Sequence, residues 1–131
     1  QPLSASPIDS DLLAIANKDR ASLALPAPQP SESLAATARA HARDMAAQNR
    51  AWHFGSDGSS PLDRVRRQGY SGHLVGENIS ETYETELETL SSWMAQPDTR
   101  VVIMDPMATR LGFSWFQEPG GKIWWTMLTG A

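Results

Sequence analysis

The pattern of apolar and polar residues predicts helices in the first two thirds of the chain and paired strands at its end. Apolar residues recur at helical spacing over 10–23, and the proline-rich segment 26–30 is expected to stop this helix because proline lacks a backbone donor. A second helix is predicted from a cap at Ser31 or Ser33 to Asn49, with its apolar stripe facing the core.

Shorter elements follow in the middle of the chain. The run Ser60-Pro61-Leu62-Asp63 combines a capping residue, a proline suited to the first helical position and an acid near the positive end of the helix dipole. It therefore predicts a short helix that stops at Gly69. Residues 74–79 predict a strand or an extended segment, and 82–95 predict a fourth helix that Pro97 ends.

The last part of the chain has the signals of a hairpin. The aromatic-rich runs 111–117 and 122–129 are separated by the turn sequence Glu118-Pro119-Gly120-Gly121, so they should pair antiparallel. Without regular alternation of strands and helices, the pattern favours an α+β fold with helices packed on a small antiparallel sheet. We expect 1–8 to be a flexible N-terminal segment and 9–131 to form a single domain.

Charge and composition narrow the classes of function. The 131 residues include 11 Lys and Arg against 15 Asp and Glu, and the basic residues cluster only at Arg64, Arg66 and Arg67, which argues against a nucleic-acid partner. No apolar run approaches the roughly 20 residues of a transmembrane helix. The absence of cysteine excludes disulfides, thiol catalysis and thiolate zinc sites. The chain starts at Gln1 without a methionine, which suits removal of a signal peptide or a shortened chain, and we expect the former.

The three histidines differ in their surroundings. His41 lies in the apolar stripe of the second helix and is predicted to be packed with one hydrogen bond. His53 lies between Trp52 and Phe54 at the start of a turn-rich loop, where a binding role and a packing role are both open. His73 is expected to be exposed, because it follows a glycine in a polar turn.

Acidic residues fall into two groups. Glu77 stands in the otherwise apolar segment 75–79, so its carboxylate must be paired, hydrogen-bonded or bound to a ligand; a structural salt bridge is the plain alternative. Asn78 could take part in the same network. By contrast, the acidic run is predicted to be a solvated face without a metal role; it comprises Glu81, Glu84, Glu86 and Glu88.

An ordered set of short motifs runs through most of the chain, from about residue 12 to residue 129. It comprises His41-Ala-Arg-Asp-Met45, Asn49, His53-Phe-Gly55, Asp57-Gly-Ser59, Pro61, Arg64, Gly69-Tyr70, Gly76-Glu-Asn-Ile79, Trp93-Met94, Pro97, Arg100, Ile103-Met104 and Gly112-Phe113. With these motifs the chain resembles a bacterial member of the CAP superfamily, the cysteine-rich secretory proteins, antigen 5 and pathogenesis-related 1 proteins. The resemblance implies an α-β-α sandwich, export to an extracellular or periplasmic location, and a central cleft.

In that family the cleft gathers two histidines and two acidic residues, in some members around a divalent metal. His53 matches the first histidine and Glu77 matches the acid of the Gly-Glu-Asn motif. Gln96 stands where animal members carry the second acid, and Thr99 stands where bacterial relatives carry the second histidine. The resemblance thus predicts a cleft lined by His53, Glu77, Gln96 and Thr99 that retains half of the polar quartet.

The departure at Thr99 bears on cofactors. A tetrahedral zinc site needs about four ligands, or three plus water, and His53 and Glu77 are two at most. Two ways of binding a metal remain open. The cleft could hold a divalent cation weakly through oxygen ligands and water, or Asp98 or His73 could reach into the cleft as a further ligand. No cofactor is certain.

Two functions of different class follow. The favoured one is an exported, monomeric binding or interaction module whose cleft holds a small ligand, lipid, peptide or envelope component. The alternative is a peptidase-like hydrolase in which Glu77 or His53 acts as base toward a cleft-bound water or metal. In a purely structural reading, His53 and Glu77 only hydrogen-bond each other.

Overall fold

The computed structural model describes residues 18, 20–21, 25 and 27–131, so most of the predicted helix 10–23 and the predicted segment 1–8 lie outside the described residues. The elements are β1 (Gln29–Pro30), α2 (Glu32–Gln48), α3 (Pro61–Arg67), β2 (Leu74–Glu81), α4 (Glu86–Ala95), α5 (Pro97–Met104), β3 (Arg110–Gln117) and β4 (Ile123–Gly130).

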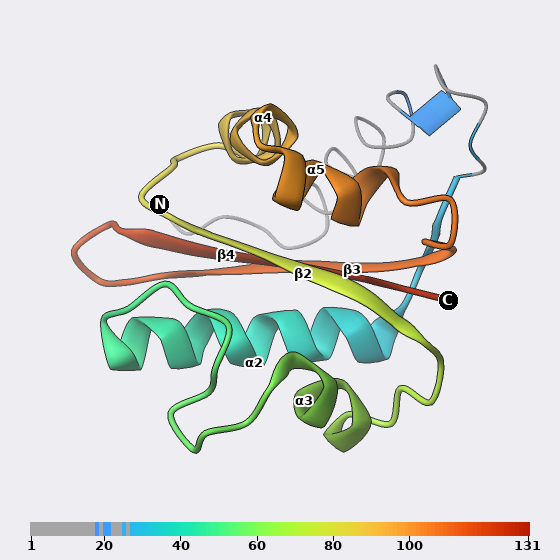
Figure 1. Cartoon of the computed structure of the whole chain (residues 1–131). Coiled ribbons are helices and arrows are strands. Elements are labelled where there is room, and N and C mark those ends of the chain that lie inside the picture. The colour runs from blue at the N-terminus through green and yellow to red at the C-terminus, as the bar shows by residue number, and fades with distance from the viewer. Residues whose placement is uncertain (1–17, 19, 22–24, 26) are drawn as a thin grey trace.

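These elements form three layers. A four-stranded sheet of order β1-β3-β4-β2 lies in the middle, with α2 and α3 on one face and α4 and α5 on the other (Figure 1). The strands β3 and β4 form the predicted antiparallel hairpin, and β2 pairs antiparallel with the other side of β4. The α-β-α sandwich is therefore confirmed.

The sheet has one strand that was not predicted. The two-residue strand β1 pairs parallel to β3, with Gln29 opposite Arg110 and Pro30 opposite Leu111. It belongs to the proline-rich segment, which was predicted only to stop a helix. Proline is tolerated there because β1 is an edge strand and need not donate along its outer side.

Helix α2 packs closely against the sheet. Ser31 caps it by accepting a hydrogen bond from the backbone of Leu34, and Asn49 ends it in the left-handed conformation with φ 54°. Its backbone approaches β3 so closely that a side-chain carbon at Gly112 would lie 2.2 Å from the carbonyl carbon of Leu34. The predicted apolar stripe is buried, including His41.

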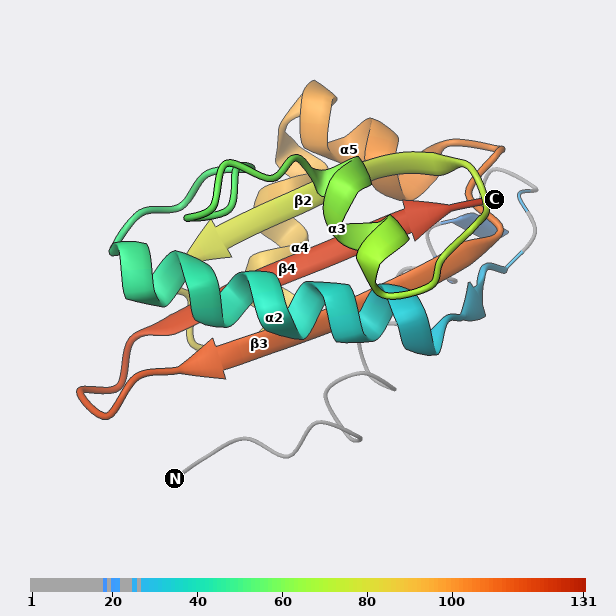
Figure 2. The same cartoon turned by 90° about the horizontal axis from the view of Figure 1, so that it is seen from below.

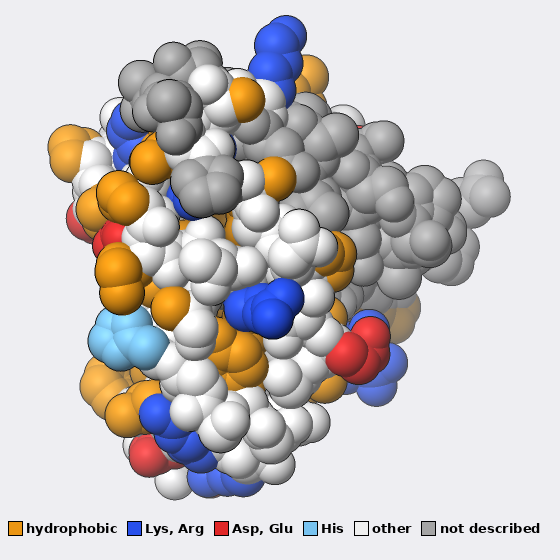
Figure 3. All heavy atoms as spheres, turned by 90° about the vertical axis from the view of Figure 1, so that its right-hand side faces the viewer, with side chains coloured by type: hydrophobic (Ala, Val, Ile, Leu, Met, Phe, Trp, Pro, Cys, Tyr) orange, Lys and Arg blue, Asp and Glu red, His pale blue; other side chains and the backbone are white. Residues whose placement is uncertain are grey.

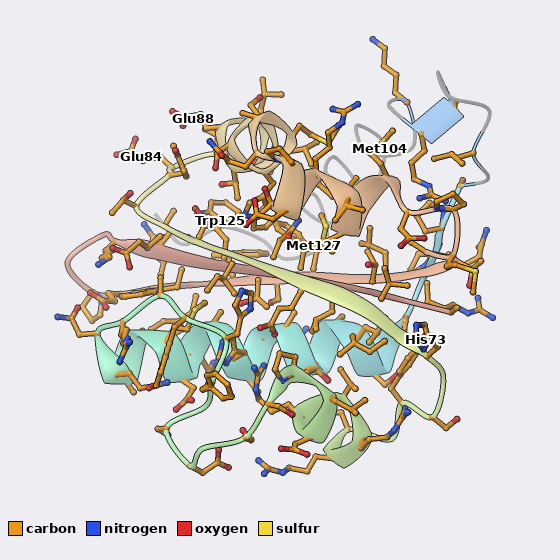
Figure 4. All side chains as sticks on the ribbon, viewed as in Figure 1. His73, Glu84, Glu88, Met104, Trp125 and Met127 are labelled. Carbon is orange, nitrogen blue, oxygen red and sulfur yellow. The ribbon has the colours of Figure 1, made fainter. Side chains whose placement is uncertain are left out.

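The opposite face holds an aromatic core. Trp125 and Met127 point from β4 toward the α4 and α5 layer (Figure 4). Phe113 stacks on Trp125 with ring centroids 5.7 Å apart, and Trp93 of α4 meets Phe113 edge to face at 6.4 Å. These rings fix α4 on the sheet.

The predictions for residues 82–104 need two corrections. Helix α4 begins at Glu86 rather than at residue 82, because Thr85 is its N-cap and accepts from the backbone of Glu88. Helix α5 was not predicted, since Pro97 was taken only as a stop. Pro97 does follow the end of α4, but its fixed φ also suits the first position of the next helix.

The predicted solvated acidic face is confirmed in part. Glu84 and Glu88 are exposed and lie on the outer side near α4 (Figure 4), whereas Glu81 and Glu86 are half-buried. Lys122 Nζ lies 3.5 Å from the Glu81 carboxylate. On another face, side chains of both charges are interspersed with hydrophobic ones (Figure 3). Among the helices that the structure describes, none combines the length and apolar character needed to cross a membrane.

Candidate functional site

The site is built on the edge strand β2, whose neighbouring residues point to opposite faces of the sheet. Glu77 points toward α2 and α3, where it contacts Arg64. Asn78 points the other way and donates to the backbone carbonyl of Thr99 in α5. Through these two side chains the Gly-Glu-Asn motif contacts the helices on both faces of the sheet.

The Glu77 carboxylate is held on both oxygens. Arg64 Nη1 lies 2.9 Å from Oε2 and Arg64 Nη2 lies 3.4 Å from Oε1. His53 Nδ1 lies 2.9 Å from Oε1, and the Glu77 side chain is only 1% exposed. The prediction that Glu77 must be paired or hydrogen-bonded is confirmed.

The charge state of Glu77 follows from these partners. Burial alone disfavours the charged carboxylate, but the hydrogen bonds from His53 and Arg64 and the nearby charge of Arg64 outweigh it, so the pKa of Glu77 is lowered. Glu77 is consequently an anion at neutral pH, paired with the guanidinium of Arg64.

The ionised carboxylate orients His53. A carboxylate only accepts, so His53 Nδ1 must donate to it, which leaves the Nε2 lone pair of the neutral ring unprotonated. The His53 side chain is 50% exposed. Arg64 also donates to the backbone carbonyl of His53, so one arginine holds both the loop and the strand.

Loop 51–60 is fixed on α2 before it reaches α3. Asp44 accepts from the backbone and the hydroxyl of Ser56, at 2.7 and 2.6 Å. The predicted cap of α3 is a full capping box, in which Ser60 and Asp63 each accept from the other's backbone. These local bonds place Arg64 on the first turns of α3, facing Glu77.

Comparison with known proteins gives the family. The model of the CAP family, described as the cysteine-rich secretory protein family, matches residues 13–128. This chain belongs to the CAP family.

Individual CAP relatives show how far the likeness extends. The uncharacterized protein YkwD of Bacillus subtilis strain 168 is 30% identical over 129 residues, covering 98% of this chain and 49% of YkwD, so the chain spans about half of that relative. An outer surface protein from Borrelia burgdorferi matches with a TM-score of 0.90 at 15% identity, covering 99% of this chain and 96% of that one. An extracellular protein containing an SCP domain from Bacillus anthracis str. Ames matches with a TM-score of 0.84 at 20% identity, covering 100% of this chain and 45% of that one. The two structures show the fold alone.

The other CAP cleft positions have different surroundings. Gln96 is exposed and precedes α5 without capping it through its side chain. The hydroxyl of Thr99 lies 2.6 Å from the backbone carbonyl of Trp93, which it can donate to. The structure thus joins His53 to Glu77, whereas it ties Thr99 to the end of α4. Asp98 and His73 are exposed.

The residues present do not fit the divalent cation of some CAP members. Among the described residues, no three His, Asp or Glu side chains are grouped so that they could hold a metal ion. Both oxygens of Glu77 already accept from Arg64 or His53, so a cation at this carboxylate would compete with the guanidinium of Arg64.

Two residues that lie close to Glu77, Arg64 and His41, were not predicted to do so. Arg64 was noted within a group of three arginines and, alone among the three, in the set of family motifs, but no contact with Glu77 was predicted for it. His41 was predicted as a packed histidine with one hydrogen bond, and this is confirmed by its bond to the Trp52 carbonyl at 2.8 Å. Its position 3.9 Å from Glu77 could not be read from the helical pattern.

Proposed function

We propose that this CAP chain is an exported binding module whose contact group is the His53 imidazole. The observation that carries the proposal is the fixed set of partners around Glu77, in which Arg64 and His53 hold the two carboxylate oxygens. A carboxylate that holds one imidazole nitrogen pre-orients the ring, and the ring's other nitrogen then accepts a hydrogen bond from a ligand.

The ligand classes are a small ligand, lipid, peptide or envelope component with a donor for His53 Nε2. An extracellular or periplasmic location is supported by the names of two structural relatives, an outer surface protein and an extracellular protein. The contacts of Gln96 and Thr99 support a role in joining α4 to α5, so the proposed binding surface centres on His53.

A hydrolase is the second candidate, because His53 and Glu77 form the base-and-orienter half of a nucleophilic site. In that scheme His53 would be the base, since the Glu77 side chain is buried away from water. Within the described part of the chain, no hydroxyl side chain hydrogen-bonds His53. The contacts therefore support binding better than hydrolysis.

Co-sedimentation tests the proposal. Wild-type protein, His53→Ala and the control His73→Ala, which alters an exposed histidine elsewhere, are mixed with purified bacterial cell-wall sacculi, anionic phospholipid vesicles and immobilised casein peptides. We expect retention on one of these materials that His53→Ala loses and His73→Ala keeps. Equal retention of all three proteins, or no retention, would contradict the proposal. Ester or peptide turnover that His53→Ala abolishes would establish the hydrolase instead.

A further inference from the structure

The loop residues around His53 are held by side chains and not by other parts of the main chain. In the part of the chain that the structure describes, no main-chain hydrogen bond involves residues 51–54. Their carbonyls accept from side chains instead: His41 Nε2 lies 2.8 Å from the Trp52 oxygen, and Arg64 donates to the His53 oxygen. The position of this segment therefore depends on the side chains that bond it.

Gln48, the last residue of α2, contacts both neighbours of His53. Helix α2 and loop 51–60 lie side by side on one face of the sheet (Figure 2). Gln48 Oε1 lies 2.8 Å from the indole Nε1 of Trp52, and Gln48 Nε2 lies 3.3 Å from the carbonyl oxygen of Phe54. One side chain thus joins the residue before His53 and the residue after it to the helix.

These contacts require an amide at position 48. An indole N–H only donates and a carbonyl oxygen only accepts, so the side chain must present an acceptor and a donor together. Gln48 Nε2 also donates to Asp44 Oδ2 at 3.1 Å, one helical turn earlier. A carboxylate at position 48 would lose both donated bonds and would lie beside the carboxylate of Asp44. The chemistry of the amide, and not only its length, therefore holds the loop.

The bond to Gln48 also fixes the aromatic ring next to His53. The guanidinium carbon of Arg50 lies 3.6 Å from the centroid of the Trp52 ring, and Phe54 meets Trp52 edge to face with centroids 5.5 Å apart. The ring between these two aromatic residues, His53, instead bonds Glu77 of β2. The packing of Trp52 and Phe54 at the end of α2 thus goes with the contact between His53 and β2.

We propose that Gln48 is a positioning residue for the imidazole of His53. The His53 side chain is 50% exposed, so water competes for its Nδ1 hydrogen unless the loop keeps this nitrogen 2.9 Å from Glu77. By holding both neighbours, Gln48 limits the movement of the loop and keeps Nδ1–H on the carboxylate, with Nε2 as the acceptor. This inference rests on the proposed function, because it takes His53 as the contact group.

The tautomer of His53 in the ligand-free protein tests the proposal. Imidazole ¹⁵N shifts are compared between wild type, Gln48→Leu and the control Gln68→Leu, which makes the same change at an exposed glutamine whose side chain has no hydrogen bond to the described residues. We expect the Nδ1–H tautomer in wild type and in the control, and a mixture with the Nε2–H tautomer in Gln48→Leu. A mixture in wild type or in the control would overturn the proposal.

A second variant covers the case in which Gln48→Leu does not fold. Gln48→Glu has nearly the same shape and keeps an acceptor for Trp52, but it has no donor for Phe54 or Asp44. It should therefore also give a mixture of tautomers. Wild-type shifts in the variants of Gln48 that fold would refute the positioning role.

A binding measurement separates this inference from the proposed function. On a material that retains the wild type, Gln48→Leu should bind about tenfold more weakly, because the ring must be ordered when the ligand binds. No retention of the wild type would overturn the proposed function alone, since the tautomer is measured without a ligand. Unchanged affinity in Gln48→Leu despite a mixture of tautomers would overturn the role of Gln48 in binding.

Discussion

The two faces of the central sheet use their polar side chains differently. On the α4–α5 face, side chains donate to main-chain carbonyls and so hold the layers together: Asn78 to Thr99, Trp93 to Ile79, Trp125 to Tyr83 and Thr129 to Val102. On the α2–α3 face, Arg64, Glu77 and His53 form a side-chain network in which the His53 ring is half exposed. The first arrangement joins layers of the fold, whereas the second presents the proposed contact group, His53, at the surface.

Breaking the ion pair on the α2–α3 face should have the largest effect on stability. Arg64→Ala leaves the Glu77 carboxylate buried without its cation, so the free energy of unfolding should fall by about 3–5 kcal/mol. Urea denaturation measures this change. The control Arg67→Ala breaks an exposed ion pair with Asp57 and should cost only about 0–1 kcal/mol. Similar losses of unfolding free energy in the two variants would show that the buried Arg64–Glu77 pair contributes no more to stability than an exposed ion pair.

The same face should make the protein sensitive to acid. Burial lowers the pKa of His41 in the folded state, so as pH falls below about 6.5 the unfolded chain takes up a proton that the folded chain resists, and stability falls. Glu77, Arg64 and Asp44 are the charged groups that act on His41.

Glu77 acts in the same direction at lower pH. Its folded-state pKa is lowered, so its contribution is complete above about pH 4.3 and is lost as pH falls through the lowered value. Urea midpoints measured against pH should therefore decline in two stages. His41→Gln should remove the upper stage, and a profile that keeps that stage would assign it to another group.

A substitution on the α4–α5 face should have a smaller effect on stability and should leave the α2–α3 face unchanged. Thr99→Val removes the hydroxyl bond to the Trp93 carbonyl and should lower the free energy of unfolding by about 1 kcal/mol. Because Thr99 is tied to the end of α4, His53 ring resonances should not move. A changed His53 spectrum in this variant would place Thr99 in the same cleft as His53, as the family resemblance predicted.

The smallest stability effect is expected at the proposed contact group itself. His53→Ala removes a half-exposed ring whose bond to Glu77 is partly screened, so it should cost about 0–1 kcal/mol in urea denaturation. A much larger loss would mean that His53 is chiefly a structural partner of Glu77.

The fold was predictable where signals are local. The Ser31 cap, the Ser60–Asp63 capping box and the turn at 118–121 each lie within a few residues of the element they define. Helix α5 was missed because Pro97 fits both the end of one helix and the start of another. Strand β1 was missed because its pairing with β3 joins residues about eighty positions apart.

The site was predictable only in part, for a similar reason. Burial of Glu77 could be inferred from its apolar neighbours, and its convergence with His53 followed from the family resemblance. That Arg64 is the partner depends on how α3 is placed by loop 51–60, and the orientation of His41 Nδ1 depends on the Trp52 carbonyl. Neither is encoded in residue spacing.

The tautomer of His53 tests the account most directly, because the central claim is that an ionised Glu77 holds Nδ1–H and leaves Nε2 as the acceptor. Imidazole ¹⁵N shifts of the neutral ring can be compared between wild type and Glu77→Gln. The account predicts the Nδ1–H tautomer in wild type and its loss in the variant. A wild-type ring protonated at Nε2, or one that is the same in both proteins, would contradict it.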